Sequence, residues 1–471
     1  MLQSVSSSLV RRMGALGIAS AIVLGACAES RQNGPAGSGG ASQTESPSGG
    51  SSQNVEASGG TDALGGQSGT TGGAGSATGG AGTGGTGPTG GAAATGGVVH
   101  TGGSTATGGV VHTGGAMATG GSSSATGGAS ATGGIGAAGT GGTGEPAVRF
   151  VGRMDFTDAA GPRFAWSGSG VIASFSGTSA SVNLAGGQQY TVVVDGAVQS
   201  TLIPTAGTTT VAQGLSDGTH TVELYRRTEA SQGESQFLGF DFGSGQLLAP
   251  PAPPARRLEI VGDSITCGYG NEGADQYCGF TPDTENHYLT YGAIAARSLE
   301  AELVTVAWSG KGVVCNYGDA ADSCTNPLPV YYDRVLPDRP DLEWDFASYQ
   351  PDAVVLNLGT NDFSTDVDPS QAEFEDAYRS FLEHIRSKYP TAYLLCTNGP
   401  MLTDPDLSTV RGYIDNVVQA LNSAGDSRVG SFEITPQDGT NGYGCDWHPS
   451  LVTHQNMAAE LEAALRSALG W

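Results

Sequence analysis

One segment, Leu258-Glu-Ile-Val-Gly-Asp-Ser264-Ile-Thr-Cys-Gly-Tyr-Gly270, indicates the fold of the second half of this chain. Its short apolar run ends abruptly in Gly-Asp-Ser, which predicts a buried strand that stops at a turn. In an open α/β sheet, ligands bind at the carboxyl ends of the strands. The Ser264 hydroxyl is therefore expected at a binding edge, and Ser264 is a candidate nucleophile if other residues supply a base and an oxyanion site.

Apolar segments alternate with helical patterns from residue 256 to residue 471. This alternation predicts a doubly wound parallel sheet with helices on both of its faces, an α/β fold. We expect strands at 258–262, 302–307, 353–358, 392–397 and 428–434, and helices at about 285–300, 370–388, 406–424 and 452–469.

Three further motifs lie at the same predicted edge of the sheet. They are Trp308-Ser-Gly310-Lys-Gly312 after the second strand, Gly359-Thr-Asn361-Asp362 after the third, and Cys445-Asp-Trp-His448-Pro-Ser450 before the last helix. Each motif is a weak signal alone. Together with Gly-Asp-Ser, in this order and at one edge, they form a strong one.

These residue types suit ester hydrolysis through an acylated serine. A serine hydroxyl is a weak nucleophile until a base takes its proton, and His448 can accept that proton and later return it to the leaving alcohol. The oxyanion of the tetrahedral intermediate needs preorganised donors. We assign these donors to the main-chain N–H groups of Ser264 and Gly310 and to the Asn361 amide. This chemistry requires no metal and no organic cofactor.

The four motifs resemble those of the SGNH, or GDSL-type, hydrolases, whose four letters match Ser264, Gly310, Asn361 and His448. More specifically, the chain resembles carbohydrate esterase family two, whose members place a β-sandwich before the hydrolase domain. The resemblance covers about residues 147–471. It implies a flavodoxin-like hydrolase sheet and the removal of acetyl groups from plant polysaccharides such as xylan or glucomannan, or from their oligosaccharides.

Three residues near these motifs have open roles. We expect the carboxylate of Asp446 to orient the His448 imidazole, although family members vary here and a main-chain carbonyl is the alternative. Asp362 is a candidate for binding a sugar hydroxyl, and its alternative role is to hold its loop. Trp447 is expected to line the acetyl or sugar pocket, and its alternative is packing in the core.

Residues 147–248 carry short alternating strand patterns and no helical stretch, which predicts a β-sandwich of the jelly-roll type. This domain either binds glycan or supports the hydrolase domain. The proline-rich segment 249–255 is expected to be a stiff linker between the two domains. The clearest strand patterns are at 171–175, 179–184, 190–195, 208–211, 220–225 and 237–242, with turn dipeptides at Asp195-Gly196 and Asp217-Gly218.

The N-terminal part of the chain indicates export. Residues 1–27 combine a basic start, a short apolar run and Leu24-Gly-Ala-Cys27, which resembles a bacterial lipobox and implies lipidation of Cys27. Residues 28–146 are rich in Gly, Ser, Thr and Ala and are expected to be a disordered tether. We expect a lipid-anchored protein of the cell envelope, with the outer membrane or cell surface favoured.

The formal net charge is −25. Nucleic acid and anionic lipid surfaces both attract basic proteins, so this charge argues against either as a partner. Contact with a membrane is expected only through the lipid anchor. We expect a monomer that acts on a neutral carbohydrate ester.

Six cysteines follow residue 260, and export favours disulfide bonds between them. We expect three local pairs, although the sequence alone allows fifteen connectivities and a zinc site is the rival interpretation. The expected pairs are Cys267–Cys278, Cys315–Cys324 and Cys396–Cys445.

Two rival functions remain at this point. The same machinery could act on another short-chain ester or a lipid. Alternatively, the chain could be a surface glycan-binding protein whose hydrolase domain is inactive.

Overall fold

The computed structural model describes residues 147–320, 323–364 and 368–471. The expected signal peptide, Cys27 and the tether lie outside the described residues. Among the residues that are described, no helix combines the length and apolar character needed to cross a membrane.

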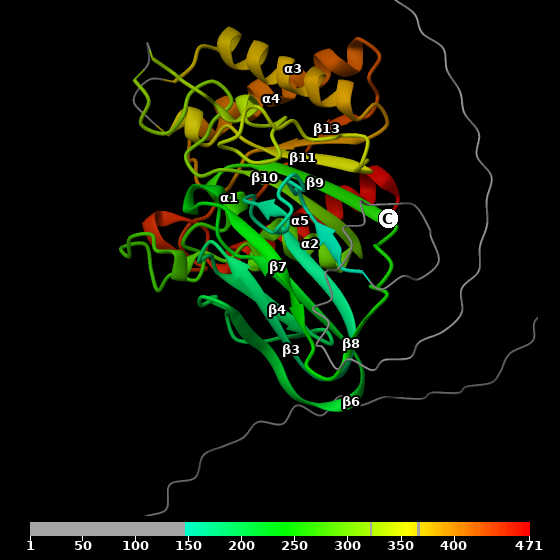
Figure 1. Cartoon of the computed structure of the whole chain (residues 1–471). Coiled ribbons are helices and arrows are strands. Elements are labelled where there is room, and N and C mark those ends of the chain that lie inside the picture. Colours follow the sequence, from blue (N-terminus) through cyan, green and yellow to red (C-terminus); the bar gives the residue numbers. More distant parts are fainter. Residues whose placement is uncertain (1–146, 321–322, 365–367) are drawn as a thin grey trace, which may run out of the picture. The chain divides into compact units, whose positions relative to one another are not determined.

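The first domain is an antiparallel β structure built around two long strands, β3 and β6 (Figure 1). β3 pairs with β6 along most of its length, with β1 and β8 over its first half and with β7 over its second half. Alternate apolar side chains of these strands are buried in one core, as in a sandwich. The strands are β1 (Arg149–Val151), β2 (Arg163–Phe164), β3 (Gly170–Ala185), β4 (Tyr190–Val194), β5 (Ala197–Val198), β6 (Thr208–Arg226), β7 (Ser235–Asp241) and β8 (Gln246–Leu248).

Two predicted strand breaks are wrong in this domain. The patterns at 171–175 and 179–184 belong to the single strand β3, and those at 208–211 and 220–225 belong to β6. The predicted turn at Asp217-Gly218 lies inside β6, because Gly218 pairs with Gly177 and the register then shifts to continue the ladder. The predicted turn at Asp195-Gly196 is confirmed, since it joins β4 to β5 with positive φ at both residues.

The second domain has the predicted parallel sheet, in the order β10-β9-β11-β12-β13. β9 is the first strand of this sheet along the chain and lies between β10 and β11, so the strand order reverses beside it. In such folds, ligands usually bind in the crevice at the carboxyl end of the strands where this reversal occurs. The strands are β9 (Arg256–Gly262), β10 (Ala301–Ala307), β11 (Ala353–Asn357), β12 (Tyr393–Thr397) and β13 (Val429–Ser431).

Helices cover both faces of this sheet (Figure 1). One core cluster joins the sheet to α3 (Gln371–Lys388) and α4 (Asp406–Ser423), and another joins it to α2 (Tyr291–Ser298) and α5 (Leu451–Leu469). Three helices match their predicted ranges within about two residues, as is usual for helix ends. α2 is shorter than predicted, because a separate 3₁₀ turn, His287–Leu289, precedes it.

Buried contacts join the two domains. Trp166 of the first domain is fully buried in the hydrolase core cluster, and its indole N–H donates to the Arg334 carbonyl at 3.3 Å. The fully buried Arg153 donates to the Tyr332 carbonyl and lies 3.5 Å from a Glu259 carboxylate oxygen. The sandwich therefore shares core packing with the hydrolase domain, which supports the structural role considered for it.

Candidate active site

Ser264 is placed by the abrupt end of β9. Asp263 is the N-cap of the short helix α1 (Ser264–Cys267), and its carboxylate accepts the Ile265 N–H at 3.0 Å. A Cβ on Gly262 would lie 2.0 Å from the Thr266 hydroxyl, so only glycine fits at this turn. Burial raises the pKa of Asp263 to about 7. Asp263 thus fixes the turn that presents Ser264.

His448 contacts Ser264 directly. Its Nε2 lies 2.9 Å from the Ser264 Oγ, within hydrogen-bond reach of a general base. The imidazole also stacks on the Tyr269 ring, with 4.1 Å between the ring centroids. Burial lowers the pKa of His448 to about 4, although the carbonyls of Asp446 and Cys445 oppose this shift. The imidazole is therefore neutral at pH 7 and able to accept the serine proton.

The expected role of the Asp446 carboxylate is wrong. The Nδ1 of His448 lies 3.1 Å from the main-chain carbonyl oxygen of Asp446 and 3.3 Å from that of Cys445. The Asp446 carboxylate instead accepts the Tyr269 hydroxyl at 2.8 Å and the Phe280 N–H at 3.0 Å. Asp446 has a φ of +50°, and this turn directs its carbonyl, not its side chain, to the imidazole. The alternative prediction, that a main-chain carbonyl orients His448, is confirmed.

The oxyanion loop, which we define as residues 308–315, begins where β10 ends. Gly310 has a φ of +78°, which favours glycine. Among the described residues, the N–H groups of Ser264 and Gly310 have no hydrogen-bond partner and are free to donate. The Asn361 side-chain amide donates to the Lys311 carbonyl at 2.9 Å and to Asp263 at 3.2 Å. Because this amide has only two hydrogens, one contact must give way when an oxyanion accepts from it.

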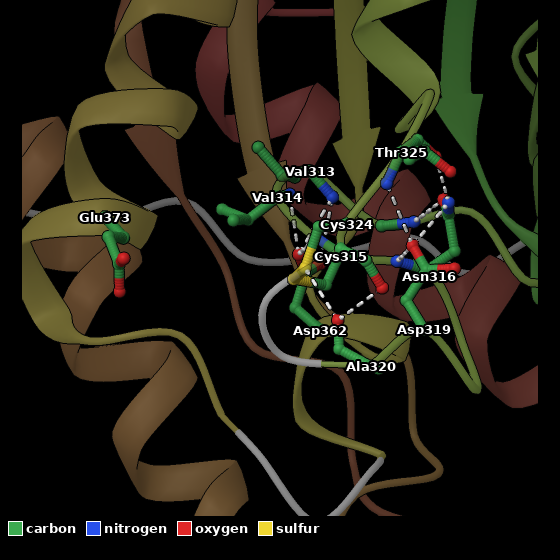
Figure 2. The surroundings of a disulfide bond; sticks show 12 residues. Val313, Val314, Cys315, Asn316, Asp319, Ala320, Cys324, Thr325, Asp362 and Glu373 are labelled. Atoms are coloured by element: carbon green, nitrogen blue, oxygen red, sulfur yellow. Dashed lines mark hydrogen bonds between the residues drawn. A yellow bond between two sulfur atoms is a disulfide. The ribbon is translucent and has the colours of Figure 1, made fainter. Parts of the chain in front are cut away.

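Asp362 holds the loop and does not face a sugar. It is fully buried, and its carboxylate accepts the main-chain N–H groups of Val313, Val314 and Cys315 at 2.7 to 3.1 Å (Figure 2). The expected substrate-binding role is therefore wrong, because no oxygen of this buried carboxylate is exposed to a ligand. Asn361 and Asp362 are adjacent, so one turn after β11 contacts both the middle and the end of the oxyanion loop.

Comparison with known proteins agrees with this geometry. Residues 150–251 match the model of the carbohydrate esterase 2 N-terminal family, and residues 260–455 match that of the GDSL-like lipase/acylhydrolase family. A family two carbohydrate esterase from Clostridium thermocellum, solved in complex with cellohexaose, is 46% identical with a TM-score of 0.66, and the match covers 69% of this chain and 100% of that one. The chain belongs to carbohydrate esterase family two.

Two further relatives differ in the share of their length that the match covers. The cellulase/esterase CelE of Acetivibrio thermocellus is 46% identical over 332 residues, which are 69% of this chain but 40% of CelE. The chain therefore spans less than half of the length of that relative. An acetylxylan esterase/glucomannan deacetylase of Cellvibrio japonicus is 28% identical over 335 residues, which are 69% of this chain and 90% of that protein.

In this family two member, the cysteines pair differently from the prediction. A disulfide joins Cys278 to Cys445, so the expected partners Cys267 and Cys396 are both buried free thiols. Cys267 lies in α1 and Cys396 in β12, and each is enclosed by the core, which keeps it from the surface loops. Only the expected pair Cys315–Cys324 is confirmed (Figure 2). The described residues contain no cluster of three or more His, Cys, Asp or Glu side chains that could hold a metal ion.

Trp447 lies beside the catalytic histidine and is not part of the core. Its side chain is 51% exposed, and its ring makes edge contacts with Tyr277 and Tyr443 at centroid distances of 6.0 and 5.2 Å. The alternative of core packing is wrong. The position suits the predicted pocket wall, and a direct contact with substrate stays a prediction.

Two residues of the site have no role in the sequence-based prediction. Tyr269 stacks on His448, and its place five residues after Ser264, between two glycines, is a usable signal. Glu229 reaches the oxyanion loop from the sandwich domain, and nothing in its local sequence marks it.

Proposed function

We propose that this protein is a carbohydrate O-acetyl esterase that acts on plant polysaccharides such as xylan or glucomannan, or on their oligosaccharides. The observation that carries this proposal is the 2.9 Å contact between Ser264 and His448 beside free oxyanion donors. The substrate class is supported by the relative named acetylxylan esterase/glucomannan deacetylase, which is matched over 90% of its length.

Each residue then has a defined step. The Ser264 Oγ attacks the acetyl carbonyl carbon while His448 Nε2 takes the hydroxyl proton. The N–H groups of Ser264 and Gly310, joined by the Asn361 amide, stabilise the oxyanion. The C–O bond to the sugar breaks, and the sugar oxygen takes the proton from His448. Water then attacks the carbonyl carbon of acetyl-Ser264 while His448 takes its proton. The bond from that carbon to the Ser264 Oγ breaks, the Oγ takes the proton from His448, and acetate leaves.

The nearest alternative is the same machinery acting on a longer or different ester. A series of p-nitrophenyl esters from acetyl to octanoyl separates the two. A carbohydrate acetyl esterase should give its highest kcat/KM with acetyl and lose activity sharply with longer chains. A rate that rises with chain length would contradict the proposal and favour a lipase.

A second function, binding of polysaccharide chains, is favoured by the exposed rings of Trp447 and Tyr277 near His448. Aromatic faces of this kind stack on sugar rings. Binding to insoluble polysaccharide by Ser264→Ala, with loss of binding in Trp447→Ala, would support this function. If the wild-type protein also bound without releasing acetate, binding would be its principal role.

Export and anchoring are also part of the proposal. The basic start, the apolar run and Leu24-Gly-Ala-Cys27 support lipidation of Cys27 at the cell envelope, and we favour the outer membrane or cell surface. We also propose that the protein acts as a monomer. Metabolic labelling with palmitate should mark the wild-type protein and not Cys27→Ser. Equal labelling of both would contradict the anchor, and sedimentation of the released protein tests the monomer.

A further inference from the structure

One carboxyl group of the sandwich domain reaches the catalytic edge of the other domain. Glu229 lies between β6 and β7, and its side chain is buried. Its Oε2 accepts the Ser309 N–H at 2.8 Å and lies 3.8 Å from the Cys267 Sγ. Ser309 directly precedes Gly310, and Cys267 ends the helix that Ser264 begins. The same oxygen therefore contacts both the oxyanion loop and the nucleophile's helix.

The Glu229 main chain is itself held on both sides. Its N–H donates to a carboxyl oxygen of Glu285 at 3.1 Å, and its carbonyl accepts from the Arg226 guanidinium at 2.7 Å. Arg226 is fully buried and also donates to the Thr228 carbonyl and the Ser235 hydroxyl. Such a connected set of hydrogen bonds gives Glu229 a fixed position at the domain contact.

The oxyanion loop needs this kind of support. Gly310 has positive φ, and glycine adopts many other conformations at little cost. Asp362 fixes the far end of the loop through Val313, Val314 and Cys315, whereas Glu229 fixes its beginning at Ser309. The N–H of Gly310, which must point at the oxyanion, lies between these two anchor points.

We infer that Glu229 is a positioning residue for the oxyanion donor Gly310, so that the β-sandwich completes the active site of the neighbouring domain. The inference rests on the proposed function, because it takes the Gly310 N–H to face an oxyanion. Glu229 acts through the Ser309 N–H and makes no contact with substrate. Its contribution belongs to the transition state, where the negative charge on the ester oxygen develops.

Three substitutions test the contact. Glu229→Ala removes the acceptor, Glu229→Met keeps much of the side-chain volume without an acceptor, and Glu229→Gln keeps one acceptor oxygen. Removal of an oxyanion donor itself costs about 10²–10³ in kcat, so loss of its support should lower kcat by about tenfold or more. With p-nitrophenyl acetate we expect this loss in the Ala and Met variants with little change in KM, and recovery of most of kcat in the Gln variant.

The control is Glu302→Gln. Glu302 pairs with Arg149 across the same domain contact but on β10, before the strand reaches the catalytic edge. This variant should keep kcat, which separates a general loosening of the domains from a local effect on Gly310. Thermal unfolding of all variants is measured alongside, and Glu229→Met serves if Glu229→Ala does not fold.

A second readout does not depend on the natural substrate. A fluorophosphonate phosphonylates Ser264 when the Oγ displaces fluoride, and the phosphoryl oxygen needs the same donors. Labelling should slow in Glu229→Met and recover in Glu229→Gln. A wild-type protein that is labelled but releases no acetate from any carbohydrate would contradict the proposed function. The labelling rates of the Glu229 variants would still test this inference.

Three results would overturn the inference. The first is a folded Ala or Met variant that keeps kcat within about twofold of wild type, where the expected loss is about tenfold. The second is an equal loss of kcat in the Met and Gln variants. The third is a lowered melting temperature without any change in kcat or labelling rate, which would leave Glu229 a purely structural residue.

Discussion

The Nδ1 of His448 lies 3.1 Å from the main-chain carbonyl oxygen of Asp446, while the carboxylate of the same aspartate contacts Tyr269 and Phe280. His448 is therefore oriented by the neutral main-chain carbonyl of Asp446. In a conventional catalytic triad, the aspartate side chain would have this role. A carbonyl still fixes the tautomer, because it accepts a hydrogen bond from the Nδ1–H and leaves the unprotonated Nε2 to face Ser264.

This arrangement makes Asp446→Asn a mild substitution. Asparagine tolerates the left-handed conformation at this position and keeps both the carbonyl and one side-chain acceptor. We expect kcat to fall less than about tenfold, whereas loss of a true triad aspartate costs about 10⁴. Steady-state kinetics beside His448→Ala measure the difference. A loss as large in Asp446→Asn as in His448→Ala would contradict the carbonyl assignment.

The pH profile of kcat/KM should fall only at an unusually low pH for a histidine base. His448 works as a base only when deprotonated, and burial lowers its pKa to about 4. We expect kcat/KM to stay high from pH 7 down to pH 5 and to fall as the pH drops through about 4. An acid limb near the ordinary histidine pKa of about 6.5 would be the opposite result.

Burial raises the pKa of Asp263 to about 7, so this carboxyl also titrates near the site and needs a control. Asp263→Asn removes this carboxyl and keeps an acceptable N-cap. An acid limb that remains near pH 4 in Asp263→Asn belongs to His448.

Asp362→Ala should damage stability as well as activity. The substitution leaves three main-chain N–H groups of the oxyanion loop without their acceptor, and each buried unsatisfied donor costs about 1–3 kcal/mol. We expect at least about 2 kcal/mol loss in the free energy of unfolding, by denaturant titration, and a lower kcat. Asp376→Ala on the exposed face of α3 is the control. A raised KM with unchanged stability would instead restore the sugar-binding role.

The disulfide Cys278–Cys445 should matter more than Cys315–Cys324. It joins residues 167 apart, whereas the other joins residues 9 apart, and a longer closed loop restricts the unfolded chain more. Replacing both cysteines of the long-range pair by serine should cost about 2–4 kcal/mol and also lower kcat, because Cys445 precedes the His448 loop. The Cys315/Cys324 double serine variant is the control. The comparison is made on stability alone, because Cys315 belongs to the oxyanion loop. Equal losses in the free energy of unfolding in both variants would contradict this prediction.

Local signals in the sequence predicted the fold and the reacting pair. The apolar runs before Ser264 and Asn361 are whole strands, and parallel strands bring their carboxyl ends to one edge. The histidine and the serine could therefore be placed together although 184 residues separate them. Glycine turns misled the prediction only where a long strand continues through a bulge, as at Gly218.

The remaining features depend on geometry that no local pattern encodes. Whether the carboxylate or the carbonyl of Asp446 faces His448 depends on one backbone angle. The partner of Cys445 is set by how the loop around Cys278 packs on the His448 loop, and Glu229 approaches from another domain. The last two features are relationships between distant segments, and in all three cases residue type alone is consistent with several arrangements.

We propose that Ser264 removes acetyl groups from carbohydrate. The most direct test is acetate release from acetylated xylan and acetylated glucomannan by the wild-type protein and by Ser264→Ala. We expect rapid release by the wild-type protein and a loss of about 10⁴-fold or more in the variant. Equal acetate release by both proteins, or none by the wild type from either polysaccharide, would contradict it.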